Sequence, residues 1–173
     1  MAWPIVGPGV SQAILEIENT RSDRIVAVVG GALLDAKLEE SLKERLRKGR
    51  TLEEFFGIAG PLGQMMHRAQ LGYLLELYDK DAYNTIIGIA RIRNLFAHHL
   101  SLNFNSNNKK LMEAFSTLKY RTMKETFHFD EQSNECRSKY ESITERRELF
   151  LSHLRWVISV IIREGYLHQL DSK

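Results

Sequence analysis

The sequence contains one cysteine, Cys136, among 173 residues. An internal disulfide and a cysteine-based metal site are therefore excluded, and we expect a reducing compartment. The longest uncharged apolar run, residues 25–34, is far shorter than the roughly 20 residues of a membrane-spanning helix. The first residues have no basic stretch and are interrupted by proline and glycine, unlike a secretory signal. We therefore predict a cytoplasmic protein that does not associate with membranes.

The sequence also lacks a strong excess of charge of one sign. Its formal net charge of +2 is too small to indicate a nucleic-acid-binding protein by itself, because phosphate binding needs a concentrated basic patch. One basic cluster lies in residues 43–50. Its charge is reduced by Glu44 within it and by Glu39 and Glu40 just before it. We interpret this cluster as the solvated end of a helix, where cations favour the helix dipole.

The residues that are present predict an all-α fold. Apolar residues make up 43% of the chain and charged residues 27%, as in ordinary globular proteins. Only 3 prolines and 11 glycines interrupt the chain, so long helices are permitted. We predict a single-domain helical bundle of about five to seven helices over residues 11–173, with a loose arm at residues 1–10. Sheet should be absent or limited to one hairpin.

Apolar periodicity and capping residues locate the individual helices. Ser11 is a candidate cap for a first short helix, and Ser22 or Asp23 for the long helix that follows. The predicted helices after the first cover residues 24–48, 61–77, 80–100, 109–120 and 138–164, with a short helical start at residues 51–54. We expect Gly49 and Gly165 to end the two longest helices. Residues 101–108 should form a loop, and residues 126–134 should be irregular.

The helix predicted at residues 80–100 carries the residues of greatest chemical interest. On a helical projection Arg93 falls in the middle of an apolar face, seven residues after Ile86. Arg91, Asn94 and His98 share an adjacent strip because they lie three and four residues apart. An arginine on an apolar face needs a partner, since its charge is costly to bury. From spacing alone we favour an ion pair between Arg93 and a carboxylate of a neighbouring helix, and a functional cluster of Arg93, Asn94 and His98 is the alternative.

Three stretches together resemble the mannitol operon repressor family. They are residues 60–63 (Gly-Pro-Leu-Gly), residues 68–73 (Arg-Ala-Gln-Leu-Gly-Tyr) and residues 89–98 (Ile-Ala-Arg-Ile-Arg-Asn-Leu-Phe-Ala-His). The resemblance covers roughly residues 30–105 and implies an all-helical protein with a role in bacterial transcriptional repression. The sequence contains no helix-turn-helix that we can identify. We therefore expect repression through a protein partner and weak or absent direct binding to DNA. Long apolar stripes on a small domain leave surface to bury, so we also expect a homodimer.

A wider resemblance gives a second possible function. Arg93, Asn94 and His98 are similar to the Arg-x4-His motif of HEPN domains, helical bundles that include metal-independent ribonucleases. Imidazole exchanges protons near neutral pH, so His98 is suited to proton transfer at a ribose or leaving oxygen. Arg93 would stabilise the charge on the phosphorus centre, and Asn94 would orient the phosphate or the imidazole. Under this alternative the protein is an enzyme or an RNA-binding module.

The remaining candidate residues border these motifs. Arg91 and His99 lie beside Arg93, Asn94 and His98 on the same helix. Arg68 and Tyr73 belong to the second matched stretch, and we regard all four as candidate binding residues. Adjacent histidines such as His98 and His99 point about 100° apart on a helix and make a poor chelate. The sequence therefore predicts no metal site, and it contains no motif for a cofactor.

Overall fold

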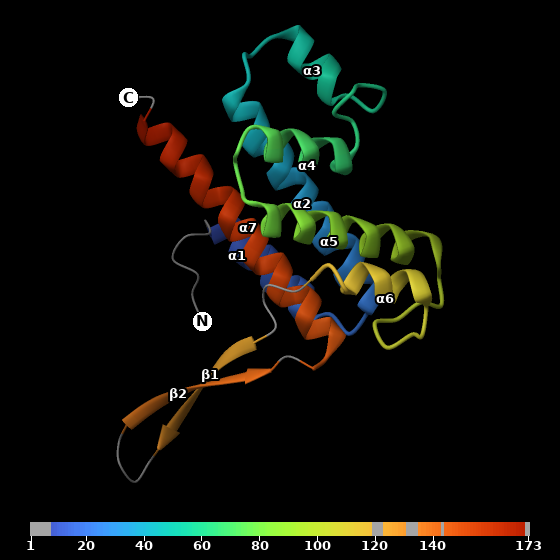
Figure 1. The fold of residues 1–173 in the computed structure, drawn as a ribbon, viewed down its shortest axis with the longest axis vertical. Coiled ribbons are helices and arrows are strands. Elements are labelled where there is room, and N and C mark those ends of the chain that lie inside the picture. Colours follow the sequence, from blue (N-terminus) through green and yellow to red (C-terminus); the bar gives the residue numbers. More distant parts are fainter. Residues whose placement is uncertain (1–7, 119–122, 131–134, 143, 172–173) are drawn as a thin grey trace.

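Seven α-helices and one antiparallel hairpin make up the described part of the chain (Figure 1). A computed structural model describes the backbone of residues 8–118, 123–130, 135–142 and 144–171, and the side chains of residues 9–118 and 144–163. The elements are α1 (Pro8–Asn19), α2 (Asp23–Arg45), α3 (Arg50–Phe56), α4 (Met65–Leu74), α5 (Lys80–His98), α6 (Lys109–Phe115), β1 (Met123–Asp130), β2 (Glu135–Ser142) and α7 (Arg146–Asp171).

The predicted all-α helical bundle is confirmed. Helix α2 packs against α1, α4, α5 and α7, and α5 crosses in front of it in the view of Figure 1. Ser22 caps α2 by accepting a hydrogen bond from the backbone N–H of Ile25, as one of the two predicted caps. None of the described helices has the length and apolar character that a bilayer crossing requires.

Several predicted boundaries differ from the structure. The helix predicted at residues 61–77 begins at Met65 and ends at Leu74 as α4, and the helix predicted at residues 109–120 ends at Phe115 as α6. Helix α1 begins at Pro8, before the predicted cap Ser11, and residues 1–7 of the predicted loose arm lie outside the described residues. Helix α2 ends at Arg45, and Gly49 instead precedes α3 with a φ of 150°, which favours glycine. Helix α7 continues through Gly165 to Asp171, because one glycine in a long helix costs only about 1 kcal/mol.

The predictions of an irregular segment at residues 126–130 and of helix at residues 138–142 were wrong, and residues 131–134 lie outside the described residues. Residues 123–130 form β1 and pair with β2, so that Met123 lies opposite Ser142 and Asp130 opposite Glu135. The last helix therefore begins at Arg146 and not near residue 138. A short alternation that includes Phe127 and Phe129 is the sequence signal for β1, but it spans too few residues to stand out beside the charged positions.

The main core lies between α2, α5, α6 and α7. Phe104, in the loop after α5, is its centre: its ring lies 4.9 Å from that of Phe96, 5.4 Å from that of Phe150 and 6.0 Å from that of Phe115. The predicted loop at residues 101–108 thus contributes a fully buried side chain to the core. A second, smaller core joins the end of α2 to α3 and the turn after it; its buried members are Leu42, Leu52, Phe56 and Leu62.

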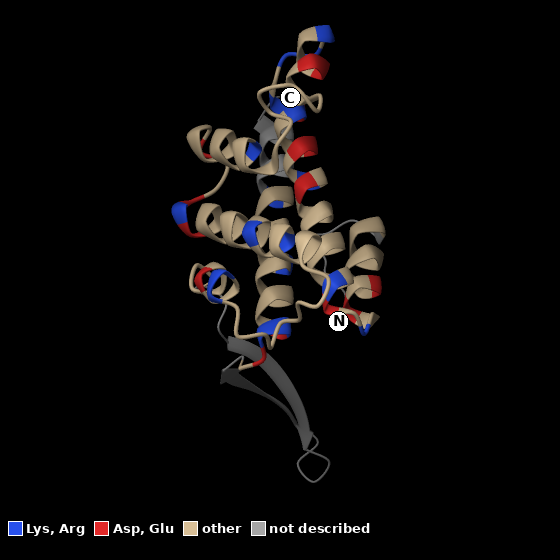
Figure 2. Cartoon of the chain, turned by 90° about the vertical axis from the view of Figure 1, so that its right-hand side faces the viewer, with Lys and Arg blue, Asp and Glu red and all other residues tan. Residues whose placement is uncertain are grey.

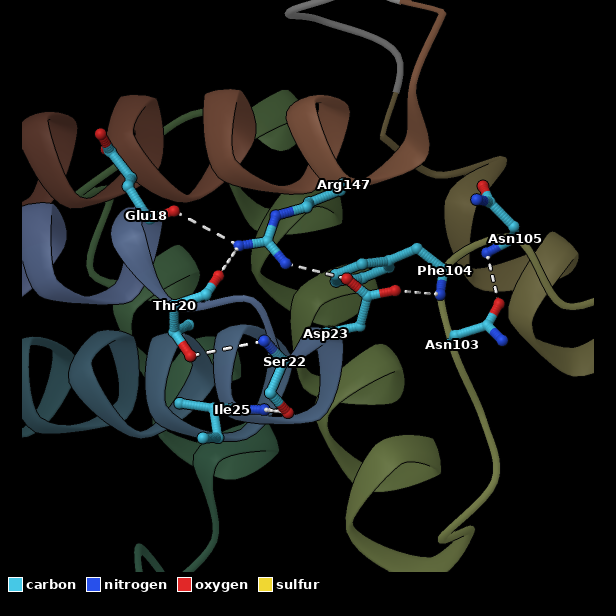
Figure 3. Close-up of polar contacts among 9 residues, drawn as sticks. All are labelled: Glu18, Thr20, Ser22, Asp23, Ile25, Asn103, Phe104, Asn105 and Arg147. Carbon is cyan, nitrogen blue, oxygen red and sulfur yellow. Dashed lines mark hydrogen bonds and ion pairs between the residues drawn. The ribbon is translucent and has the colours of Figure 1, made fainter.

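A polar junction joins three distant segments at the start of α7 (Figure 3). The Arg147 guanidinium donates to the Asp23 carboxylate at 2.9 Å and to the backbone carbonyls of Glu18 and Thr20. The other oxygen of Asp23 accepts the backbone N–H of Phe104 at 3.0 Å. The junction therefore fixes the connection between α1 and α2, the Phe104 loop and the first turn of α7 relative to one another.

We predict that Arg147→Ala lowers the free energy of unfolding by roughly 2–3 kcal/mol, because a charged hydrogen-bond donor is removed from partly buried acceptors. Urea denaturation followed by circular dichroism measures this change. The matched control is Arg50→Ala, whose side chain is 93% exposed and contacts only Glu54, with an expected cost below about 0.5 kcal/mol. Equal effects of the two substitutions would contradict a structural role for the junction.

Candidate functional site

The C-terminal half of α5 presents the predicted cluster on its surface. Arg91, Asn94, His98 and His99 are exposed, and Arg93 is half-buried. Asp79 begins the helix by accepting the backbone N–H of Ala82 at 2.8 Å, which sets the register of the whole helix. The structure thus keeps the predicted strip of Arg91, Asn94 and His98 facing outward.

Arg93 lies against the central helix α2. Its side-chain carbons cover Gly31, where an added Cβ would lie 2.6 Å from Cγ of Arg93. Its Nη1 donates to the Asn94 side-chain oxygen at 3.3 Å, and its Nε is buried without a hydrogen-bond partner among the described residues. The carboxylate partner that we expected for Arg93 is absent from the described part of the chain. Gly31 is what allows the arginine stem to pack here.

Arg24 of α2 reaches the same region and was not identified from the sequence. Its Nη2 donates to the backbone carbonyl of Ala97 at 3.1 Å, and its Nη1 is buried with no hydrogen-bond partner in the described residues. A cation at this carbonyl also favours the negative end of the α5 dipole. The contact joins residues 73 positions apart, and no local pattern in the sequence indicates it.

Arg68 forms the buried ion pair that we had expected of Arg93. Its side chain is largely buried, and its guanidinium lies 2.6 Å from a carboxylate oxygen of Asp35 and 2.8 Å from one of Glu39. It also lies over the ring of Phe56, 5.7 Å from the ring centroid. Since these contacts hold α4 against α2, Arg68 has a structural role in the described chain.

Tyr73 lies apart from the cluster on α5. Its ring stacks on Tyr83 at 4.9 Å, and with Tyr78 and Trp156 it lines a cleft of about 750 Å³ beside the turn between α4 and α5. Burial raises the pKa of the Tyr78 phenol well above its ordinary value. Tyr83 and His98 are about 22 Å apart along the helix axis. The structure therefore separates Tyr73 from the motif.

The turn after α3 is a second feature with an unusual construction. The backbone N–H of Leu62 donates to the carbonyl of Phe55 at 2.9 Å, and that of Gly63 donates to Gly60 at 3.0 Å. An added Cβ on Gly60 would lie 2.2 Å from a backbone oxygen, so only glycine fits there. Leu62 points into the small core, whereas Phe55 is half-exposed and Ile58 is fully exposed. We call Phe55 and Ile58 the α3 tip.

The basic residues near the α3 tip lie in a segment, residues 39–54, that holds five cations and five glutamates, and two of these cations are paired within it. Lys43 pairs with Glu39 at 3.0 Å and with Glu53 at 3.2 Å, and its hydrogen bond to Glu39 raises its pKa. Arg50 pairs with Glu54 at 2.8 Å. Basic and acidic segments are likewise distributed together over the helices in Figure 2. This surface therefore lacks the concentrated positive charge that binding to a phosphate backbone requires.

A comparison of the chain with known protein families, curated proteins and solved structures found no match. The resemblances to mannitol operon repressors and to HEPN domains therefore stay predictions. Among the described residues no group of three or more His, Cys, Asp or Glu side chains is placed to hold a metal ion. The α3 tip and the cluster of α5 are the two surfaces of the described chain that we consider for function.

We predict that Arg68→Ala costs about 3–5 kcal/mol of unfolding free energy, because it leaves the partly buried Asp35 without its ion pair and Glu39 with Lys43 alone as its described cation. Arg93→Ala has no carboxylate to leave unpaired among the described residues and should cost about 1 kcal/mol or less. Chemical denaturation of the two variants tests the difference. A larger loss for Arg93→Ala than for Arg68→Ala would show that the stabilising arginine is misassigned.

Proposed function

We propose that this protein is a bacterial transcriptional regulator that acts by binding another protein, as its resemblance to mannitol operon repressors implies. The observation that carries the proposal is the α3 tip. Two large apolar side chains, Phe55 and Ile58, are held in water by a turn that only glycine at position 60 permits. A rigid, exposed apolar pair is typical of a contact for a protein partner, because its burial on binding releases water at little entropic cost.

The charge distribution supports a protein partner over duplex DNA. The net charge is +2, and Lys43 and Arg50, the cations nearest to the tip for which contacts are described, are paired with glutamates. Specific DNA recognition places a helix or strand in a groove and surrounds it with cations on the phosphates. The α3 tip instead presents aliphatic and aromatic surface.

The test uses a bacterial host strain from which the gene has been deleted, complemented with variants of the full chain. Wild type should restore the transcripts that the deletion changes, whereas Ile58→Asp should leave them changed by several-fold, because a carboxylate in an apolar contact is costly to desolvate. The control is Leu100→Asp, which alters an exposed leucine far from α3. Full complementation by Ile58→Asp, or tight and salt-resistant binding of the purified protein to one duplex operator, would refute the proposal.

A second candidate function, metal-independent binding or cleavage of RNA, is favoured by one observation. Arg24 and Arg93 both reach the C-terminal half of α5, the part of the helix that carries the exposed His98, through hydrogen bonds to Ala97 and Asn94. Guanidinium groups bind phosphate oxygens through charge-assisted hydrogen bonds. In cleavage, the ribose 2′-oxygen would bond to phosphorus while the bond to the 5′-oxygen breaks. His98 would carry the proton from the 2′-hydroxyl or to the 5′-oxygen, and Arg93 would stabilise the added negative charge.

We predict for this candidate that His98→Ala lowers cleavage of single-stranded RNA in EDTA by a factor of about 100 or more. The melting temperature should stay nearly unchanged, because His98 is exposed and makes no described hydrogen bond. His67→Ala is the matched control, since His67 is an exposed histidine of α4 outside the α5 cluster. Absence of cleavage by wild-type protein, or equal activity of the two variants, would exclude a catalytic His98.

A further inference from the structure

The outward face of α2 carries an uncharged stripe. Ile25 and Val29 are 47% and 45% exposed, and Ala32 and Ala36 are also exposed. On a helix these four residues lie within about 60° of one another, opposite the buried Leu34. The solvent face of a helix in a globular protein is normally polar, so three turns without a charge indicate a surface that is covered by a partner.

The stripe is complementary to a second copy of itself. If a two-fold axis passes midway between residues 30 and 31, two antiparallel copies of α2 place Ile25 opposite Ala36 and Val29 opposite Ala32. Each large side chain then faces a small one, which lets the two helices approach closely. A parallel pair would instead place Ile25 against Ile25 and leave the alanines facing each other.

The charges at the ends of the stripe agree with the same axis. Arg21 lies just before α2, is exposed, and has no partner among the described residues. Glu40 lies at the other end with its side chain 56% exposed, in contact with Lys37. In the antiparallel register the segment before α2 of one copy, which carries Arg21, lies at the end of α2 of the other copy that carries Glu40, at both ends of the pair. Opposite charges at both rims specify this register and disfavour the parallel one.

We propose that the protein is a closed homodimer in which α2 pairs antiparallel with α2 of a second copy through Ile25, Val29, Ala32 and Ala36. Closed two-fold dimers bury the same surface on both copies, as this self-complementary stripe requires. The α3 tip and the α5 cluster are made by other residues, so the inference is independent of the proposed function.

Cysteine cross-linking tests the register in full-length protein with Cys136→Ser as background. Ile25→Cys and Ala36→Cys are made as separate variants. In the proposed dimer residue 25 faces residue 36 of the other copy, whereas two copies of residue 25 are about 16 Å apart along the axis, beyond the reach of a disulfide. Mild oxidation should therefore give a covalent dimer after the two variants are mixed and allowed to exchange, and little from either alone. Cross-linking of either variant alone, or none in the mixture, would overturn the register.

Substitutions test whether the stripe holds the dimer together. Light scattering should give a dimer mass for wild type and a monomer mass for Val29→Arg, with unchanged far-ultraviolet circular dichroism. Met112→Arg, at a residue that is also 45% exposed but lies on α6, should remain a dimer. Arg21→Glu should raise the dissociation constant at least several-fold, and the double variant Arg21→Glu/Glu40→Arg should restore it. A monomeric wild type, or a dimeric Val29→Arg, would refute the proposal.

Discussion

The structure depends on the close approach of two helices to the Gly30-Gly31 pair in α2, one at each glycine. An added Cβ on Gly30 would lie 2.8 Å from Leu154 of α7, and one on Gly31 would lie 2.6 Å from Arg93 of α5. A larger side chain at either glycine would force α7 or α5 to move away from α2. Glycine inside a helix costs about 1 kcal/mol in propensity, so this cost is offset by the packing that the pair allows.

The same constraint determines how the α5 cluster is presented. Because Gly31 accepts the aliphatic stem of Arg93, the guanidinium emerges beside Asn94 at the edge of the α2–α5 contact. Arg24 approaches from α2 one turn further along α5, at Ala97. Arg68 stabilises the fold through ion pairs with two carboxylates. Arg93 has no carboxylate partner within the described chain. Structural and candidate functional arginines are therefore different residues.

Helix α2 combines three surfaces with different tasks. Its inner face supplies the core, its end supports the α3 turn through Leu42, and its outward face carries the uncharged stripe from Ile25 to Ala36. The Arg147 junction fixes the start of this helix to α1, α7 and the Phe104 loop. Partner contacts through the α3 tip and pairing through the stripe are sterically compatible proposals, because the two surfaces are separated along the length of α2.

The sequence by itself determined the all-α class, the course of most helices and the outward strip of Arg91, Asn94 and His98, because these follow from local periodicity and capping. It did not determine which arginine is paired with a carboxylate. The ion pair of Arg68 with Asp35 joins residues 33 positions apart, and the hydrogen bond of Arg24 to Ala97 joins residues 73 positions apart. The exposure of Ile25 and Val29 was equally hidden, since the run from Ile25 to Leu34 is apolar all round. Only the tertiary structure decided the ion-pair partners and the exposed residues of α2. Both depend on which helices pack against each other, and this packing involves residues far apart in the sequence.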